Sequence, residues 1–425
     1  MVDNDPQSGS TSRVKSCALI ALGPVLLVIV LAVVFVVNNR PPNVYIPTHK
    51  LPKDDGYDYF VRAGKMLGVI GPSSSSARLP NSWTVPELKR YVISNSPALT
   101  MLRVGLKRQH VIPAMRSLNL QFPDYFAQCR ELARRLVDEG RYYRAIGSYG
   151  RAAESHLDCI EFGAAFARGG ALIAGLVGIA IEAIGTHDFG QLLPKLNAHE
   201  LERVARRLER IEARRVPFRA VMEEEGRSSA AELIETMSGG AIRDHFSNPV
   251  NWFRGAPMST PSGSAGDAWN NARFAFSNKT AAVRSVMDYC NAIAAETSKP
   301  YTDKSNVPEP GNAVAQWWTP DYNRARLAWE KAAAVSAVLR AEIAVRRYGL
   351  DHNRFPDRLA DLVPVYLKAV PVDPLGLGKP LRYRPLDGGK SFVLYSLGPN
   401  LKDDGGTPGR PSGAWRSGDI VAGKW

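Results

Sequence analysis

The sequence predicts a mainly α-helical, membrane-anchored protein with a small α+β domain at its C-terminus, and three observations lead to this prediction. Residues 17–37 are uncharged and almost entirely apolar, which is typical of a membrane-spanning helix. Apolar side chains recur at helical spacing through most of residues 54–300. Residues 321–425 instead begin with a long helical run and continue through short strand-like segments separated by Pro and Gly.

The composition is that of an ordinary globular chain. It has 425 residues, 45% of them hydrophobic and 22% charged, which is long enough for two or three domains. Only residues 1–15, which are polar and rich in Ser, Gly and Thr, are predicted to be a disordered tail.

Residues 16–38 are predicted to be a single transmembrane helix, because about 20 apolar residues at 1.5 Å rise span a hydrocarbon core. The sequence Val-Val-Asn-Asn-Arg at 36–40 lacks the small residues of a signal-peptidase site, so the anchor is expected to stay uncleaved. The basic residues on the two sides do not decide the orientation. A short tail before a large domain favours a cytoplasmic tail, an inner-membrane location, and exported C-terminal domains.

Residues 39–53 contain four prolines, which favour an extended spacer between the membrane and the first domain. The net charge of +13 raises the question of nucleic acid binding, but an exported domain does not meet the chromosome. No nucleic acid partner is therefore expected. The positive charge either is a diffuse solvated excess or holds the domain against acidic lipids or wall polymers.

Residues 54–300 are predicted to form a helical domain. Its helices are expected at 57–67, 86–93, 125–138, 199–215 and 278–296, with Gly140 as a left-handed C-cap. The helix at 199–215 is expected to bury an apolar stripe and to expose a solvated basic face, with a basic face for an acidic partner as the alternative. The stripe is Leu201, Val204, Leu208 and Ile211, and the basic face is Arg203, Arg206, Arg207, Arg210 and Arg214. Residues 163–184 are apolar but have only 13 uncharged residues between Arg168 and Glu182, short of the roughly 18 that suggest a membrane span. They are predicted to be a core helix, in which Gly175 and Gly178 allow close backbone approach.

Residues 140–153 resemble the turn and second helix of a tetratricopeptide repeat, with Gly140 at the turn. A repeat array needs about three stacked units, and no second copy follows. A plain helical hairpin is the favoured interpretation over a repeat module.

No local motif identifies a reaction. The cysteines outside the anchor, Cys129, Cys159 and Cys290, have no Cys-x-x-Cys spacing and are predicted to be buried free thiols. The sequence contains no His-Glu-x-x-His, Gly-x-Ser-x-Gly, phosphate-binding loop or dinucleotide fingerprint. The expectation is a protein without enzymatic activity, although a site assembled in space between helices stays an alternative.

Five motifs follow the long C-terminal helix. They are Tyr-Gly-Leu-Asp-His-Asn-Arg-Phe-Pro at 348–356, Tyr-Leu-Lys-Ala-Val-Pro-Val-Asp-Pro at 366–374, Arg-Tyr-Arg at 382–384, Phe-Val-Leu-Tyr-Ser-Leu-Gly at 392–398 and Asp-Asp-Gly-Gly at 403–406. Their order resembles the globular domain of the major pseudopilins of type II secretion. The resemblance covers about a quarter of the chain and implies a long helix packed on a short antiparallel sheet.

The resemblance also implies a calcium site in the acidic loop, since pseudopilins bind calcium there through carboxylates and backbone carbonyls. The implied metal ligands are Ser396, Leu397, Asp403, Asp404 and Asp419. This chain departs from the family pattern at 399–402, where Pro-Asn-Leu-Lys replaces Ala-Asp-Gly. A simple Asp/Gly turn, with Lys402 and Arg410 as counter-charges, is therefore the competing interpretation.

The anchor differs from that of pilins and pseudopilins. It lacks their Gly/Phe processing site and the Glu of their first helical turns, and nearly 300 residues separate it from the C-terminal motifs. The layout resembles uncharacterised bacterial membrane-anchored proteins with a pseudopilin-like tail. The sequence therefore predicts a structural or interaction protein of the cell envelope, with protein partners there. The alternatives are an envelope enzyme acting on wall polymers and a secretion-system-associated component.

Overall fold

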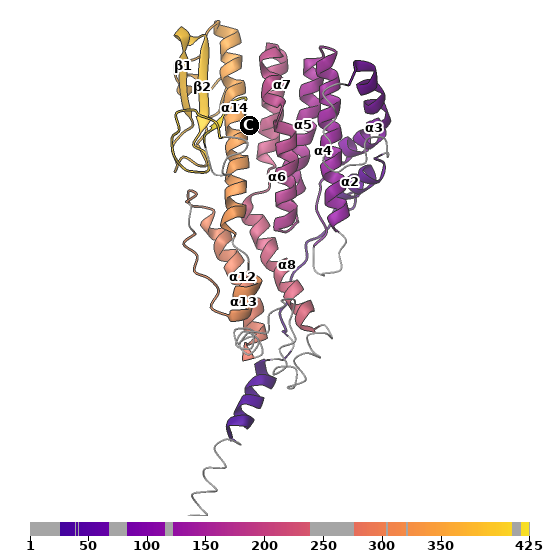
Figure 1. Ribbon diagram of the computed structural model, residues 1–425, viewed down its shortest axis with the longest axis vertical. Helices are drawn as coiled ribbons and strands as arrows, with labels where there is room; N and C mark the ends of the chain where they lie inside the picture. Colours follow the sequence, from indigo (N-terminus) through magenta and orange to yellow (C-terminus); the bar gives the residue numbers. More distant parts are fainter. Residues whose placement is uncertain are drawn as a thin grey trace, which may run out of the picture. The chain divides into compact units, whose positions relative to one another are not determined.

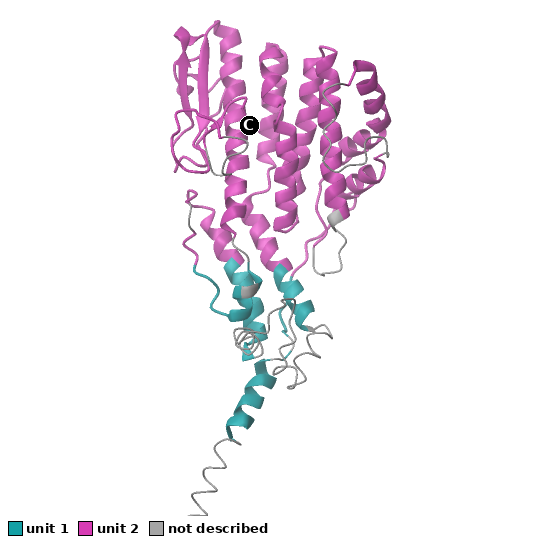
Figure 2. Ribbon diagram, in the orientation of Figure 1, with its two compact units in different colours: residues 1–46, 229–289, 308–320 teal, residues 47–228, 290–307, 321–425 magenta. Residues whose placement is uncertain are grey.

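The computed structural model describes residues 26–38, 40, 42–67, 83–114, 122–238, 276–302, 305–319, 322–409 and 418–424. The predicted tail, residues 1–15, and the first part of the predicted membrane span, residues 16–25, lie outside this part. The fold is mainly helical with a small antiparallel sheet, which confirms the mainly α part of the predicted fold class. Contacts divide the chain into two compact units (Figure 2). Unit 1 comprises residues 1–46, 229–289 and 308–320, and unit 2 comprises residues 47–228, 290–307 and 321–425.

Unit 2 begins with four helices that pack consecutively (Figure 1). They are α2 (Gly56–Lys65), α3 (Val85–Leu106), α4 (Phe122–Ala145) and α5 (Tyr149–Phe166). Asp55 caps α2 by accepting a hydrogen bond from the Tyr57 amide at 2.9 Å, and the same oxygen accepts one from the Val111 amide at 3.0 Å. Phe60, Leu99, Leu132 and Phe162 contribute one side chain from each helix to a shared apolar core.

Helix α4 continues through Gly140, so the predicted C-cap at this glycine is wrong. The turn into α5 falls instead at Gly147, whose φ of 74° is the left-handed conformation that suits glycine. Gly140 serves a different purpose, because a Cβ atom there would lie 2.8 Å from the His156 ring of α5. Helices α4 and α5 pack against each other as a helical hairpin.

Helix α6 (Leu172–Thr186) packs against α5, α4 and α14. By length and composition alone, the stretch Leu172–Gln191 is the one helical segment of the described residues that could cross a membrane. Half of this stretch is buried inside the protein. Its buried face includes Ala174, Val177 and Ile181, so packing accounts for its apolar character.

Two 3₁₀ turns, η1 (Phe189–Gln191) and η2 (Leu193–Lys195), lead from α6 into α7 (Ala198–Ala213). Asn197 and Glu200 form a capping box at the start of α7. The predicted apolar stripe of this helix is buried. Its members are Leu201, Val204, Leu208 and Ile211.

Helix α14 (Asn323–His352) belongs to unit 2, together with α2 to α7. Leu339 and Ile343 join the core of α5 and α7, whereas Val338 and Val345 pack with the C-terminal sheet. The sequence predicted separate domains at 54–300 and 321–425, but the contacts place most of both in unit 2. The difference arises because α14 is apolar on two faces.

The C-terminal part follows the predicted order of a helix and a strand meander. Asn353 ends α14 with a φ of 55°. Strands β1 (Arg382–Leu386), β2 (Ser391–Ser396) and β3 (Ile420–Val421) form an antiparallel sheet in the order β1-β2-β3, with Tyr383 opposite Leu394. The short turns η3 (Leu359–Leu362) and η4 (Asp387–Gly389) lie before β1 and between β1 and β2.

Unit 1 contains the helix Leu26–Asn38, residues 42–46, α13 (Ala313–Trp318) and parts of two longer helices. The boundary between the units falls within α8 (Phe218–Ser238) and within α12 (Lys279–Glu296). Val44 and Ile46 pack on the apolar core of this unit, and the Asn38 side-chain amide donates to the Phe276 carbonyl at 2.7 Å. The proline-rich segment is thus packed along part of its length.

Candidate functional site

The predicted calcium ligands Ser396 and Leu397 lie at the end of β2, and both contact the carboxylate of Asp373. The Ser396 hydroxyl donates to one oxygen of Asp373 at 2.6 Å, and the Leu397 amide donates to the other at 2.9 Å. The Leu375 amide adds a third hydrogen bond at 3.0 Å. Asp373 is 1% exposed, and its burial raises its pKa although these three donors oppose the shift. Asp373 therefore connects the turn before β1 to the end of β2.

Asp403 and Asp404 lie in the loop between β2 and β3 but have different partners. One oxygen of Asp403 accepts hydrogen bonds from the Tyr395 hydroxyl at 2.8 Å and the Gly405 amide at 3.0 Å. The hydrogen bond from Tyr395 is the main reason that the pKa of Asp403 is lowered. Asp404 is exposed and accepts from the side-chain amide of Asn400 at 2.8 Å.

Asp419, at the start of β3, organises the same loop from the other side. Its carboxylate accepts hydrogen bonds from the Asp404 amide at 3.3 Å and the Gly406 amide at 2.7 Å. The residue is 4% exposed, and burial raises its pKa. Its position explains why this loop closes on the sheet: the two backbone amides are satisfied by one buried carboxylate.

The structure brings the predicted ligands to one end of the sheet but does not gather their carboxylates. Within the described residues, no group of three or more His, Cys, Asp or Glu side chains is placed to hold a metal ion. Among the described residues, the cation that pairs with Asp403 is Arg382, whose Nε lies 3.5 Å from the carboxylate. Lys402 was expected in this role. Arg410, the other expected counter-charge, lies outside the described residues. Calcium binding stays a prediction.

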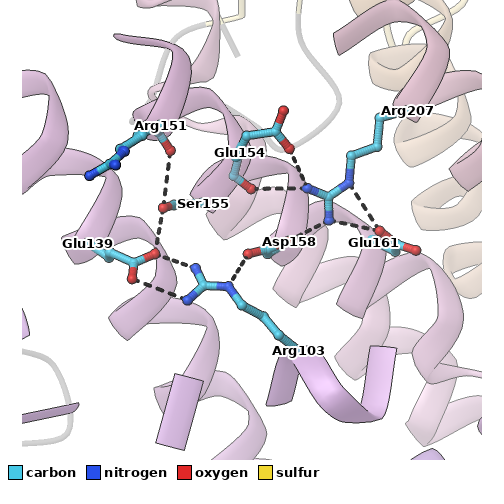
Figure 3. Close-up of polar contacts among 8 residues, drawn as sticks. All are labelled: Arg103, Glu139, Arg151, Glu154, Ser155, Asp158, Glu161 and Arg207. Atoms are coloured by element: carbon cyan, nitrogen blue, oxygen red, sulfur yellow. Dashed lines mark hydrogen bonds and ion pairs between the residues drawn. The ribbon is translucent and has the colours of Figure 1, made fainter. Parts of the chain in front are cut away.

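A second cluster of charged residues lies between α3, α4, α5 and α7 (Figure 3). The guanidinium of Arg103 bridges Glu139 of α4 and Asp158 of α5, with Nε 2.6 Å from the Asp158 carboxylate. The Ser155 hydroxyl donates to Glu139 at 2.6 Å. Since Arg103 satisfies carboxylates on two other helices, it fixes the spacing of α3, α4 and α5.

Arg207 of α7 occupies the other side of this cluster (Figure 3). Its guanidinium contacts Glu154 at 2.7 Å, Glu161 at 2.8 Å and the second oxygen of Asp158. Asp158 is thus shared by the two arginines. The sequence grouped Arg207 with the exposed basic face of its helix, but the side chain is largely buried and fully engaged in ion pairs. No sequence spacing could reveal this, because its partners lie on another helix.

A cavity of about 380 Å³ lies beside His110, between the ends of α3, α5 and α7. The Nδ1 atom of His110 donates to the Ala165 carbonyl at 3.2 Å, while Nε2 is buried without a partner among the described residues. Burial lowers the pKa of His110 to about 3, so the imidazole is neutral. Glu161 is the carboxylate among the lining residues, and Arg207 already binds it. The cavity therefore lacks the free acid that a hydrolytic pair would need.

A larger cavity, of about 620 Å³, lies between α6, α7 and α14 and is called here the α6–α14 cavity. Its walls are mainly apolar and come from four helices of unit 2. The wall residues include Ile160, Ile179, Ala183, Leu208, Ala328 and Leu339. Arg215 and Glu182, which pair at 2.7 Å, also line it, together with Arg324 and Lys331 of α14.

The described cysteines and the two most buried histidines are in states unsuited to nucleophilic or acid-base chemistry. Cys129, Cys159 and Cys290 are buried free thiols, as predicted, and burial raises the pKa of each. Burial lowers the pKa of His156 to about 4, as it does that of His110 to about 3.

Comparison with protein-family models, with curated proteins and with solved structures finds no match to the chain.

Proposed function

We propose that the chain is a single-pass, membrane-anchored protein of a bacterial cell envelope, with a structural or interaction role rather than an enzymatic one. The observation that carries this proposal is the helix Leu26–Asn38, whose apolar side chains are exposed. Leu26, Val28 and Val36 are between 61% and 64% exposed. Burying such a side chain contributes about 1.5–3 kcal/mol, so a row of them exposed to water would be costly. A lipid bilayer supplies the missing apolar environment.

The helical body supports an interaction role because its charges neutralise one another. Arg103 and Arg207 bind four carboxylates between them, and Arg215 binds Glu182 and Glu212. Paired charges of this kind fix the positions of helices, whereas catalysis needs at least one acid, base or nucleophile that faces substrate. The proposed partners are the membrane and other envelope proteins, without nucleic acid.

The C-terminal part of the proposed protein is similar to pseudopilins in the order of its elements. A long helix with a left-handed C-terminal residue is followed by a short antiparallel meander and a loop containing Asp403 and Asp404. In this proposal the exported part begins after the anchor, and α6 is a helix of the protein core rather than a second span.

Cysteine accessibility in intact cells tests the topology. Lys107→Cys and Arg206→Cys place exposed thiols before and after α6. If the helical body is exported, a maleimide that cannot cross membranes should label both positions from the extracytoplasmic side. The native Cys129, Cys159 and Cys290 are buried and should contribute little background labelling. If only one of the two were labelled, α6 would span the membrane and the single-pass proposal would fail.

A matched pair of variants tests the anchor itself. Val30→Arg should release the chain from the membrane fraction, because a charge at the centre of a span costs about 2.5–3.5 kcal/mol on insertion scales. Ile173→Arg, on the exposed surface of α6, should leave the chain membrane-bound. Retention of the Val30→Arg chain in carbonate-washed membranes would argue against the proposed anchor.

A further inference from the structure

Small residues form part of the face of α14 that lines the α6–α14 cavity. Ala328 and Ala332 are one helical turn apart on α14, and Ala183 faces the same space from α6. Larger side chains at these positions would fill the gap between the helices. The small side chains therefore maintain a space whose volume, about 620 Å³, is in the range of ordinary small-molecule sites.

The floor of the cavity is made of buried apolar side chains. Ile160, Leu208 and Leu339 are each at most 3% exposed, and they line the cavity together with Ile179 and Val335. An aliphatic chain that lay on this floor would be removed from water on the side that contacts these residues. The walls offer few hydrogen-bonding groups to a polar ligand body, which favours a hydrocarbon over a sugar or a nucleotide.

The charged groups of the cavity favour an anion. Its lining contains one carboxylate, Glu182, whose Oε1 lies 2.7 Å from Arg215, so these two charges compensate each other. Arg324 and Lys331 remain as cations on the α14 side. No ion pair within the described residues joins Lys331 to a carboxylate, and burial lowers the pKa of this half-buried ammonium group. An anionic partner would offset that loss of hydration.

We propose that the α6–α14 cavity binds an amphiphile with one aliphatic chain and an anionic head, the chain lying among Ile160, Leu208 and Leu339 and the head bound by Lys331. A carboxylate and a phosphate share this head-group chemistry. This inference goes beyond the proposed function and does not depend on the anchor, because all the lining residues belong to unit 2.

Photo-crosslinking with a carboxylate probe tests the binding. The full chain, held in an amphipathic polymer rather than in detergent, is irradiated with dodecanoate that carries a diazirine near its methyl end. Mass spectrometry of the peptides should find saturable labelling of the segments that contain Ile160, Ile179 or Leu208. Labelling that does not saturate, or that lies outside these segments, would overturn the proposal.

Competition then defines the head group. Unlabelled dodecanoate and dodecyl phosphate should displace the probe, and whichever does so at lower concentration identifies the preferred anion. Dodecanol, which has the same chain without the charge, should compete at least about tenfold less well, because a charge-assisted hydrogen bond is lost. Equal competition by dodecanol would overturn the role given to Lys331.

Matched variants locate the site. Lys331→Met should weaken dodecanoate binding by at least about tenfold, and Lys331→Arg should retain it. Ala332→Leu should block labelling by filling the cavity, whereas Ala333→Leu, at the adjacent position outside the lining, should not. If Ala332→Leu fails to fold, Ala183→Leu fills the cavity from an exposed position of α6. Undiminished labelling of the folded filling variant would place the ligand elsewhere and refute the proposal.

Discussion

The carbonyl oxygen of Gly163 in α5 lies 2.7 Å from the point where a Cβ atom on Gly178 of α6 would stand. The relationship is reciprocal, since the Gly178 carbonyl oxygen lies 2.6 Å from the corresponding point on Gly163. The two backbones therefore meet without an intervening side chain. The sequence predicted a close approach at Gly178 but did not identify Gly163 as its partner.

Replacing Gly178 by Ala is expected to force α5 and α6 apart and to lower the free energy of unfolding by about 1–3 kcal/mol. Gly311→Ala is the control, because no atom lies within 4 Å of its added Cβ atom and its φ is not in the left-handed region. The control should change the free energy of unfolding by less than about 0.5 kcal/mol. Urea denaturation followed by circular dichroism measures both, and equal midpoints would contradict the close packing described here.

Arg207→Ala is expected to be strongly destabilising, since it leaves Glu154, Asp158 and Glu161 without their shared cation. We expect a loss of about 2–4 kcal/mol, somewhat below the value for a fully buried pair because the cluster is partly exposed. Arg206, the next residue, forms an exposed pair with Glu202 at 2.7 Å. Its replacement by Ala should cost less than about 1 kcal/mol in the same denaturation experiment. Similar losses for the two variants would show that the buried cluster contributes little.

The burial of His156 predicts a dependence of stability on pH. Its pKa is lowered to about 4, mainly by burial, while its Nδ1 atom donates to the Gly185 carbonyl at 2.7 Å. Between about pH 6.5 and 4 the unfolded chain binds a proton that the folded chain does not, so stability falls as the pH is lowered. The contribution approaches about 1.4 kcal/mol per pH unit within this window.

His156→Gln should reduce the slope of the free energy of unfolding against pH by the contribution of one proton, about 1.4 kcal/mol per pH unit at most. Gln can still donate to the Gly185 carbonyl but does not titrate. The comparison with the unmodified chain is essential, because Asp138 acts in the opposite direction. Burial raises the pKa of Asp138 to about 6, so the folded chain gains a proton there as the pH falls. Denaturation curves at several pH values between 7 and 4.5 give the two slopes, and parallel slopes would show that His156 does not contribute.

Calcium is expected to raise the melting temperature of the full chain through the loop that contains Asp403 and Asp404, if the resemblance to pseudopilins extends to metal binding. Asp404→Ala should abolish the increase, because this carboxylate is exposed and contacts only Asn400 among the interactions described above. Magnesium should substitute poorly, since it requires a tighter octahedron. An unchanged melting curve at millimolar calcium would leave Asp403 with Tyr395 and Arg382 as its partners.

The sequence predicted the structure best where the spacing of residues within one helix or strand indicates which side chains are buried. The stripe of Leu201, Val204, Leu208 and Ile211 has helical spacing, and all four residues are buried. The alternating turns and strands after α14 were predicted for the same reason. Local patterns of this kind depend on residues a few positions apart, so no knowledge of the tertiary structure is needed.

The predictions that differ from the structure concern residues whose partners are distant in sequence. Arg207 was grouped with an exposed face, but its partners lie on α5. Asp373, in the motif at 366–374, was not among the implied ligands, yet it receives hydrogen bonds from Ser396 and Leu397. The sequence did not predict that α14 packs on both the helices before it and the C-terminal sheet. The buried residues of α14 are spread around the helix rather than along one stripe, so its sequence does not indicate where the two packing faces lie.

The packing of residues 42–46 in unit 1 has a consequence for the order of events during synthesis. Asn38 is tied to Phe276, and Val44 and Ile46 belong to a core that also contains Val283 and Val314. A ribosome releases the first of these segments long before the last. Asn38, Val44 and Ile46 are therefore synthesised before the residues that pack against them, so unit 1 can be completed only after Val314 has been made.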